Sequence, residues 1–215
     1  MKISFNVNGG PKGVLVMKNG ACTMEKGMGK SNIALHFKSA DHFNNMIDGK
    51  ANPIPTKGIT KIGFLKNEFT ALTNNLSFYL KPTEELLKDN VYKKINTFLT
   101  ANVAFAALAE IGNHDETYKG IAKSIPDGVV KIYIENEELQ VFLKCNQGKL
   151  EKINKYEGKV RAYMKFKDIE TANGVLNGSI DSYTAIALEK LEISGHMGMI
   201  DNINKILFVV PRYLI

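Results

Sequence analysis

The stretches LHFKS at residues 35–39 and MKFKD at residues 164–168 are the best starting point for the fold of this 215-residue chain. Each ends a run of alternating apolar and polar residues and leads into a segment with helical periodicity. They lie 129 positions apart, and the same spacing relates Gly49 to Gly178. The pattern of residue types repeats while most identities do not, which is typical of repeated structural units. We therefore expect two copies of one unit.

Each copy is expected to begin with strands, because apolar side chains at every second position predict a strand with one buried side. Asn19 and Gly20 add a strong hairpin signal. With the offset of 129, Ile3 falls on Ile132, so the first strands of the copies are expected to match in this register. The predicted strands lie at 3–7, 14–17, 21–24 and 33–37, and again at 132–134, 141–143 and 162–166.

A helix with recognisable ends follows the strands in both copies. Ser39 and Asp168 suit an N-cap, where a side-chain oxygen accepts a backbone N–H. Gly49 and Gly178 suit the left-handed position just after a helix. The residues between carry an apolar stripe at helical spacing.

The end of each copy is predicted as a short strand followed by an amphipathic helix. The strand is expected at 62–64 in the first copy and at 191–193 in the second. The apolar helix faces run over 69–79 and 200–210. Each unit is therefore expected to be α+β.

Residues 83–128 have no counterpart in the repeat and are predicted to form a helical spacer. The domains are thus expected at 1–82, 83–128 and 129–215. The middle of the spacer is apolar nearly all round, which predicts a helix buried on most sides. Asn102 and Glu110 interrupt its apolar character and argue against a membrane span.

Composition and charge exclude several classes of protein. The net charge is +6, but there are only two arginines and no tryptophan, so nucleic-acid binding is not expected. Cys22 and Cys145 are too few for a disulfide scaffold or a four-ligand zinc site. The first residues lack the apolar core of a signal peptide, so a cytoplasmic location is expected.

Catalytic motifs are missing from the sequence. The stretch at 27–31 resembles the end of a phosphate-binding loop, but Met24 stands where the motif needs glycine and no helix is predicted to follow. His114 and His196 are the candidate bases, and neither has metal-ligand spacing to another histidine or cysteine. We therefore expect a protein that is not an enzyme and that needs no cofactor or metal.

The second copy resembles the sterol carrier protein-2 family. The resemblance rests on four stretches, at 162–173, 176–178, 191–195 and 199–202. It covers nearly all of 129–215.

The first copy is similar to the same family more faintly, through Phe37, Gly49 and Lys61. It departs from the pattern where Lys66 takes the place of Gly195. The resemblance implies, for each copy, a five-stranded and mostly antiparallel sheet covered by helices, with an apolar tunnel between them. It also implies binding of sterols, fatty acids or fatty acyl-CoA, and no catalytic residues.

The expected function is therefore an intracellular lipid-binding or lipid-transfer protein. Few arginines beside many Lys, Asn and Ile suggest an AT-rich bacterial genome, which favours a fatty acyl ligand over a sterol. The alternative is a non-catalytic interaction or scaffold protein with a filled core. An enzyme comes third and would need a site around His114 or His196. The cavity residues that the resemblance implies are Phe166, Leu176, Met197, Met199, Ile203 and Leu207.

Lysines give the first copy its own charge character. Residues 1–81 hold 11 lysines against 4 acidic residues. A carrier must meet a membrane, and each lysine near an anionic surface contributes about 1 kcal/mol. The first copy is therefore expected to contact anionic membranes through these lysines.

Overall fold

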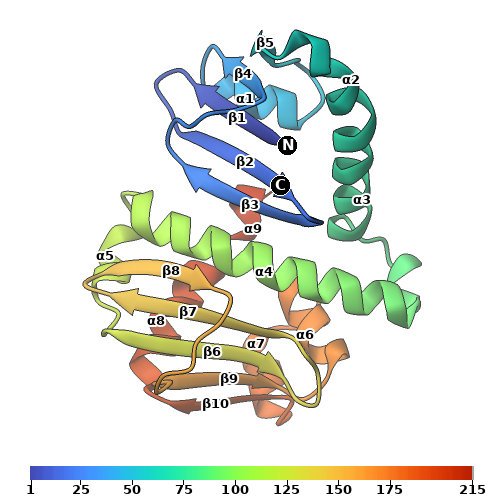
Figure 1. The fold of residues 1–215 in the computed structure, drawn as a ribbon. Coiled ribbons are helices and arrows are strands. Elements are labelled where there is room, and N and C mark those ends of the chain that lie inside the picture. The colour runs from blue at the N-terminus through green and yellow to red at the C-terminus, as the bar shows by residue number, and fades with distance from the viewer. Residues whose placement is uncertain (215) are drawn as a thin grey trace. The chain divides into compact units, whose positions relative to one another are not determined.

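A computed structural model describes residues 1–214, and the chain divides into two compact units (Figure 1). The first unit is Met1–Asn75 and the second is Leu76–Ile215. The segment predicted as a spacer, 83–128, lies within the second unit. Each unit contains its own five-stranded sheet.

The sheet of the first unit has the strand order β3-β2-β1-β4-β5. Strand β1 pairs parallel with β4, and the remaining neighbours pair antiparallel. The expectation of a mostly antiparallel sheet is corrected here, because the sheet is mixed. The strands are β1 (Lys2–Val7), β2 (Lys12–Lys18), β3 (Ala21–Lys26), β4 (Ile33–Phe37) and β5 (Ile54–Lys57).

The second unit repeats this connectivity in the order β10-β9-β6-β7-β8, with β6 and β9 parallel. Its other neighbouring strands pair antiparallel. The strands are β6 (Gly128–Ile134), β7 (Gln140–Asn146), β8 (Lys149–Ile153), β9 (Ala162–Phe166) and β10 (Leu191–Gly195).

The loop between the third and fourth strands explains the parallel pairing. Strand β8 runs antiparallel to β7 and therefore parallel to β6, and its last residue Ile153 lies in one row with Phe142 and Lys131. Strand β9 begins beside Val130, near the start of β6. Strands β7 and β6 lie between β8 and β9 in the sheet, so the intervening chain must pass over both, as Figure 1 shows. Strand β9 then continues in the direction of β8, which is also the direction of β6.

Helices follow the fourth strand in both units with the predicted caps. The Ser39 side chain accepts a hydrogen bond from the His42 N–H at 3.1 Å, and Asp168 accepts one from the Thr171 N–H at 2.7 Å. Gly49 follows its helix in the left-handed conformation, with φ 72°. The predicted caps are confirmed. The helices are α1 (Ala40–Ile47) and α6 (Ile169–Leu176).

The remaining helices differ between the units. In the first unit a 3-10 turn (Ile59–Lys61), α2 (Ile62–Phe64) and a π-helical turn (Leu65–Phe69) lead into α3 (Thr70–Leu80), which spans the unit boundary. The second unit adds a 3-10 turn (Leu86–Lys88), α4 (Asn90–His114), α5 (Lys119–Lys123), α7 (Ser182–Ala187), α8 (Met197–Leu207) and α9 (Pro211–Leu214).

The strand predicted at 62–64 is wrong, because this segment is helical and the fifth strand is Ile54–Lys57. Pro53 and Pro55 explain the difference, since proline disfavours a helix and holds the chain extended. In the first unit the fifth strand is therefore the next element after α1. In the second unit α7 lies between α6 and the fifth strand.

The register of the first strands also differs from the prediction. The N–H of Asn8 donates to the Phe37 carbonyl, and the N–H of Glu135 donates to the Phe166 carbonyl, both at 2.9 Å. Asn8 therefore corresponds to Glu135, an offset of 127, and Ile3 corresponds to Val130 instead of Ile132. The loops before the fourth strand differ in length, so a single offset cannot hold throughout.

A glycine at the end of the fifth strand is shared by both units. Gly58 and Gly195 are left-handed, with φ 77° and 86°. A β-carbon would lie 2.2 Å from the Asn32 carbonyl oxygen at Gly58, and 2.4 Å from the Arg161 carbonyl oxygen at Gly195. Gly58 is therefore the residue of the first unit that corresponds to Gly195. The prediction that Lys66 holds this position in the first unit is wrong.

We expect Gly195→Ala to lower the free energy of unfolding by about 3 kcal/mol or more, because left-handed strain adds to a collision with backbone. Gly178→Ala is the matched control, since Gly178 has φ 76° but no heavy atom within 4 Å of an added β-carbon. It should cost about 1–2 kcal/mol. Urea unfolding followed by circular dichroism measures both, and equal losses would contradict the proposed collision.

Candidate functional site

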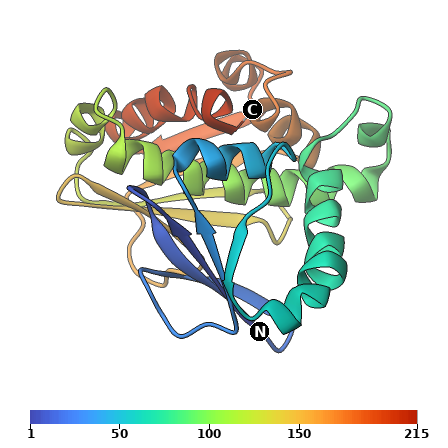
Figure 2. The same cartoon turned by 90° about the horizontal axis from the view of Figure 1, so that it is seen from above.

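The interior of the second unit is an apolar layer between one face of its sheet and its helices. Strand β6 sends Val130, Ile132 and Ile134 into this layer, as its alternating pattern predicts. Helix α4 contributes Phe105 and Leu108. Helix α4 packs on β7, β8, α6 and α8, and α8 packs on β9 and β10. Figure 2 shows α4 and α8 on the same side of the sheet.

The structure brings five of the six predicted cavity residues to this layer. Phe166, Met199 and Ile203 are buried in the core, with 3%, 0% and 0% of their surface exposed. Leu176 and Leu207 are partly buried and pack against the same core. These residues contact other side chains, so the layer is filled by the protein itself.

Met197 does not belong to this group, because 58% of its surface is exposed. It is the first residue of α8, and the preceding His196 caps the helix by accepting the Met199 N–H at 3.3 Å. The buried face of α8 begins at Met199, two residues later. The inward placement expected for Met197 is therefore corrected.

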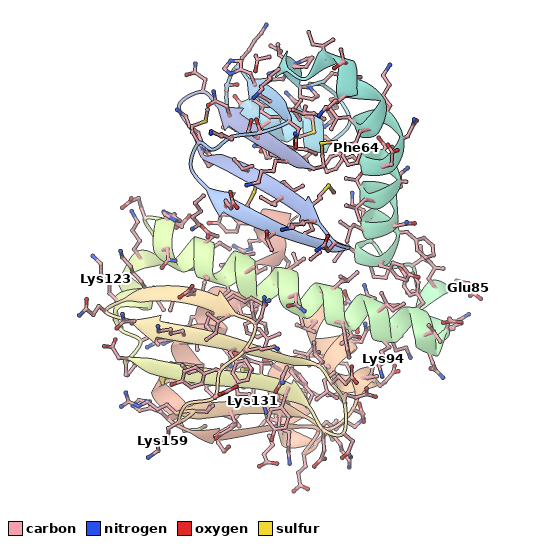
Figure 3. The ribbon with its side chains drawn as sticks, viewed as in Figure 1. Phe64, Glu85, Lys94, Lys123, Lys131 and Lys159 are labelled. Atoms are coloured by element: carbon pink, nitrogen blue, oxygen red, sulfur yellow. The ribbon has the colours of Figure 1, made fainter. Side chains whose placement is uncertain are left out.

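An apolar groove opens to the surface between α4 and α6, and it was not predicted from the sequence. Its volume is about 430 Å³. Phe98 and Ile169 line the groove and also pack against the core, so the groove leads toward the apolar layer. Lys94 also lines the groove (Figure 3). Its ammonium lies 5.7 Å from the Phe98 ring centroid and pairs with Glu137 at 2.6 Å. The remaining lining residues are Asn90, Val91 and Ile95.

A buried polar network joins α4 to α6 near this groove. The Asn173 amide donates to Asn96 Oδ1 at 2.7 Å and to Thr97 Oγ1 at 2.9 Å. Asn177 donates to the same Asn96 oxygen at 3.0 Å. The Asn96 amide in turn donates to the Tyr79 carbonyl at 2.7 Å, so the network also fixes the end of α3. Buried polar groups satisfied in this way specify one packing of the helices.

Helix α4 is long and apolar enough to cross a membrane by length and composition alone. Half of its most apolar window is buried inside the protein. Buried helices of globular proteins have the same composition, and the polar Asn96 and Thr97 are fully buried on its packed side. The structure thus places the helix in the core of the second unit.

The residues considered for catalysis are not assembled into a site. His114 is exposed and lies 3.3 Å from Glu110 on the same helix, and His196 acts as a helix cap. Burial, followed by the negative charge of Asp127, raises the pKa of the Cys145 thiol to about 12. Within residues 1–214, no three His, Cys, Asp or Glu side chains are grouped so as to hold a metal ion. The glycine-rich stretch at 27–31 joins β3 to β4, as predicted.

The model of the SCP-2 sterol transfer family matches residues 108–208, which lie within the second unit. The match begins inside α4 and ends just after α8, and it takes in part of the segment predicted as a spacer. No match was found among curated protein sequences.

Solved structures that are similar to the chain include three SCP2 proteins. UbiJ-SCP2, a ubiquinone synthesis protein, is 12% identical with a TM-score of 0.39, over 49% of this chain and 94% of its own. The sterol carrier protein domain 2 of Helicoverpa armigera is 16% identical with a TM-score of 0.39, over 60% and 92%. The sterol carrier protein 2 like 2 of Aedes aegypti is 13% identical with a TM-score of 0.34, over 49% and 93%.

We expect Asn173→Ala to lower the free energy of unfolding by about 1–3 kcal/mol, because it leaves Asn96 and Thr97 with fewer partners in a buried place. Asn44→Ala is the matched control, since Asn44 holds the same place in α1 but is exposed. Its effect should stay within about 0.5 kcal/mol. Equal effects in urea unfolding would contradict a stabilising role for the network.

Proposed function

We propose that the second unit binds the apolar chain of a lipid and that the protein carries lipids between membranes. The SCP-2 match over residues 108–208 carries this proposal. The apolar layer between sheet and helices supports it, because such a layer offers an environment from which water is excluded. The groove between α4 and α6 supports it as well, since the groove leads from the surface toward that layer.

The energetics are sufficient for a fatty acyl chain. Burial contributes about 0.8 kcal/mol per methylene, so about ten methylenes gain roughly 8 kcal/mol before ordering costs. That corresponds to a micromolar dissociation constant. A flexible chain can displace side chains one at a time in a filled layer, whereas a rigid sterol needs a void of its own shape. We therefore propose a fatty acyl ligand.

The first unit is proposed to be a diverged copy of the same unit. The shared strand order, the caps at Ser39 and Asp168 and the matching glycines Gly58 and Gly195 support this. Its buried core is smaller, with five fully buried apolar residues in one cluster. The second unit is therefore the proposed ligand site.

The alternative is a non-catalytic scaffold, which the filling of the apolar layer by side chains favours. Neither alternative involves chemistry on the ligand, and we propose that the protein is not an enzyme. Native mass spectrometry of detergent-free protein distinguishes the two, because a carrier should retain a lipid and a scaffold should not.

We expect a fluorescent fatty acid to bind saturably and to be displaced by palmitate. Ile203→Trp and Leu176→Trp should weaken this binding at least tenfold, because the larger ring fills the space that the chain would occupy. Leu188→Trp is the control, since Leu188 is 60% exposed. Circular dichroism identifies the variants that remain folded. Absence of saturable binding, or unchanged binding in both core variants, would overturn the proposal.

Contact with an anionic membrane is proposed for residues 57–66, from the end of β5 to the π-helical turn after α2. Lys57, Lys61 and Lys66 are exposed there, and Ile59 between them is 66% exposed. Lysines beside an exposed apolar side chain suit a lipid headgroup layer. Three lysines contribute about 3 kcal/mol near such a surface.

We expect the full chain to co-sediment with anionic vesicles but not with neutral ones, and about 0.5 M salt should release it. Replacing Lys57, Lys61 and Lys66 by glutamine should lower the binding constant about a hundredfold. The same change at Lys144, Lys149 and Lys159, which are exposed in the second unit, is the control with equal loss of charge. Equal loss in both variants would show that only net charge matters.

A further inference from the structure

A second pocket lies on the opposite face of the second sheet from the apolar layer. The loop 154–161, which crosses from β8 to β9, covers this face (Figure 1). Lys131 points to the covered face because its neighbours Val130 and Ile132 point into the core. The pocket holds about 340 Å³, near the lower end of the range of roughly 300–1,000 Å³ for small-molecule sites.

The side of the pocket formed by the sheet consists of three residues in one row across neighbouring strands. Lys131 lies opposite Phe142 on β7 and opposite Tyr163 on β9. All three line the pocket, and Tyr156 lines it from the loop. The Phe142 and Tyr156 ring centroids are 6.3 Å apart, with an angle of 53° between the rings.

The first unit has the same row but no room above it. Ser4 corresponds to Lys131, and it lies opposite Val14 on β2 and Ala34 on β4. Ser4 is 3% exposed, and its hydroxyl lies 2.9 Å from that of Ser31 in the crossing loop. Small side chains thus let the loop close on the sheet of the first unit. In the second unit, a lysine and two aromatic rings stand in the same row.

The charge of the pocket favours an anion. The Lys131 ammonium lies 4.7 Å from the Tyr133 ring centroid and 5.9 Å from that of Phe142. Lys155 adds a second positive charge, and Glu157 a single negative one. Within residues 1–214, the structure has no ion pair between a carboxylate and either lysine. Lys165 on the same face, by contrast, pairs with Glu192 at 2.6 Å.

We propose that this pocket is a binding site for a small planar aromatic anion. Lys131 pairs with the anionic group, because the two rings fix its ammonium without neutralising it. The rings of Tyr156 and Tyr163 contact the flat face of the ligand. The Gln140 amide supplies a hydrogen bond at the rim. This site lies on the opposite face from the proposed lipid site and does not depend on it.

The test is isothermal titration of the full chain with 2-naphthoate, an aromatic carboxylate, and with adenosine 5′-monophosphate, an aromatic phosphate. Binding of either supports the site, and the stronger of the two identifies the anionic group. Neutral 2-naphthalenemethanol should bind at least tenfold more weakly than 2-naphthoate. Lys131→Met, which keeps the aliphatic stem, should weaken anion binding at least tenfold.

Tyr163→Ala, which introduces the residue of the first unit, should weaken binding to a similar extent. Lys159→Met is the matched control, since Lys159 lies on the same loop (Figure 3) but does not line the pocket. Palmitate at saturation should leave naphthoate binding unchanged. The proposal is overturned if neither anion binds, if Lys131→Met binds as the wild type does, or if palmitate displaces naphthoate.

Discussion

The burial of α4 against the sheet and helices of the second unit is the interaction on which that unit depends. Phe105 and Leu108 on this helix are almost fully buried, and they complete the apolar layer beside β7 and β8. Leu150 on β8 of the second sheet and Cys22 on β3 of the first sheet hold equivalent positions in the strand pairings. Leu150 is only 3% exposed, whereas Cys22 is exposed. The inner face of the first sheet is therefore less covered near its β3 edge. A large closed apolar layer forms only where a long helix seals that side.

Strand alternation gives one sheet two faces of different chemistry. Val130 and Ile132 point into the proposed lipid layer, while Lys131 between them points into the pocket under the crossing loop. The parallel pairing of β6 and β9 requires that loop to cross the sheet, and a loop over a sheet face creates a covered pocket wherever bulky side chains hold it away. Phe142 and Tyr163 are such side chains. The same topology with Ser4 in the row leaves the loop closed.

Local features of the fold were predictable from the sequence, and features set by strand pairing were not. Caps such as Asp168 depend on neighbouring residues, so the sequence predicts them directly. The parallel pairing depends on the path of a loop, and no residue pattern encodes it. The buried cavity residues, such as Ile203, followed from a family resemblance and from helical faces. The row of Lys131, Phe142 and Tyr163 is scattered along the chain, and only the pairing register brings it together.

We propose that a lipid enters the second unit between α4 and α6. Opening this interface breaks the hydrogen bonds of Asn173 and Asn96, which water can replace at a net cost of about 1 kcal/mol each, and it exposes part of Phe98 and Ile169. Separating α8 from the sheet would expose Met199 and Ile203, and apolar surface gains no such compensation, at about 25 cal/mol per Å². The network therefore specifies the closed packing of α4 and α6 through bonds that water can replace when the two helices separate. The polar network beside the apolar groove is therefore the proposed route by which a ligand enters and leaves an interior that side chains fill.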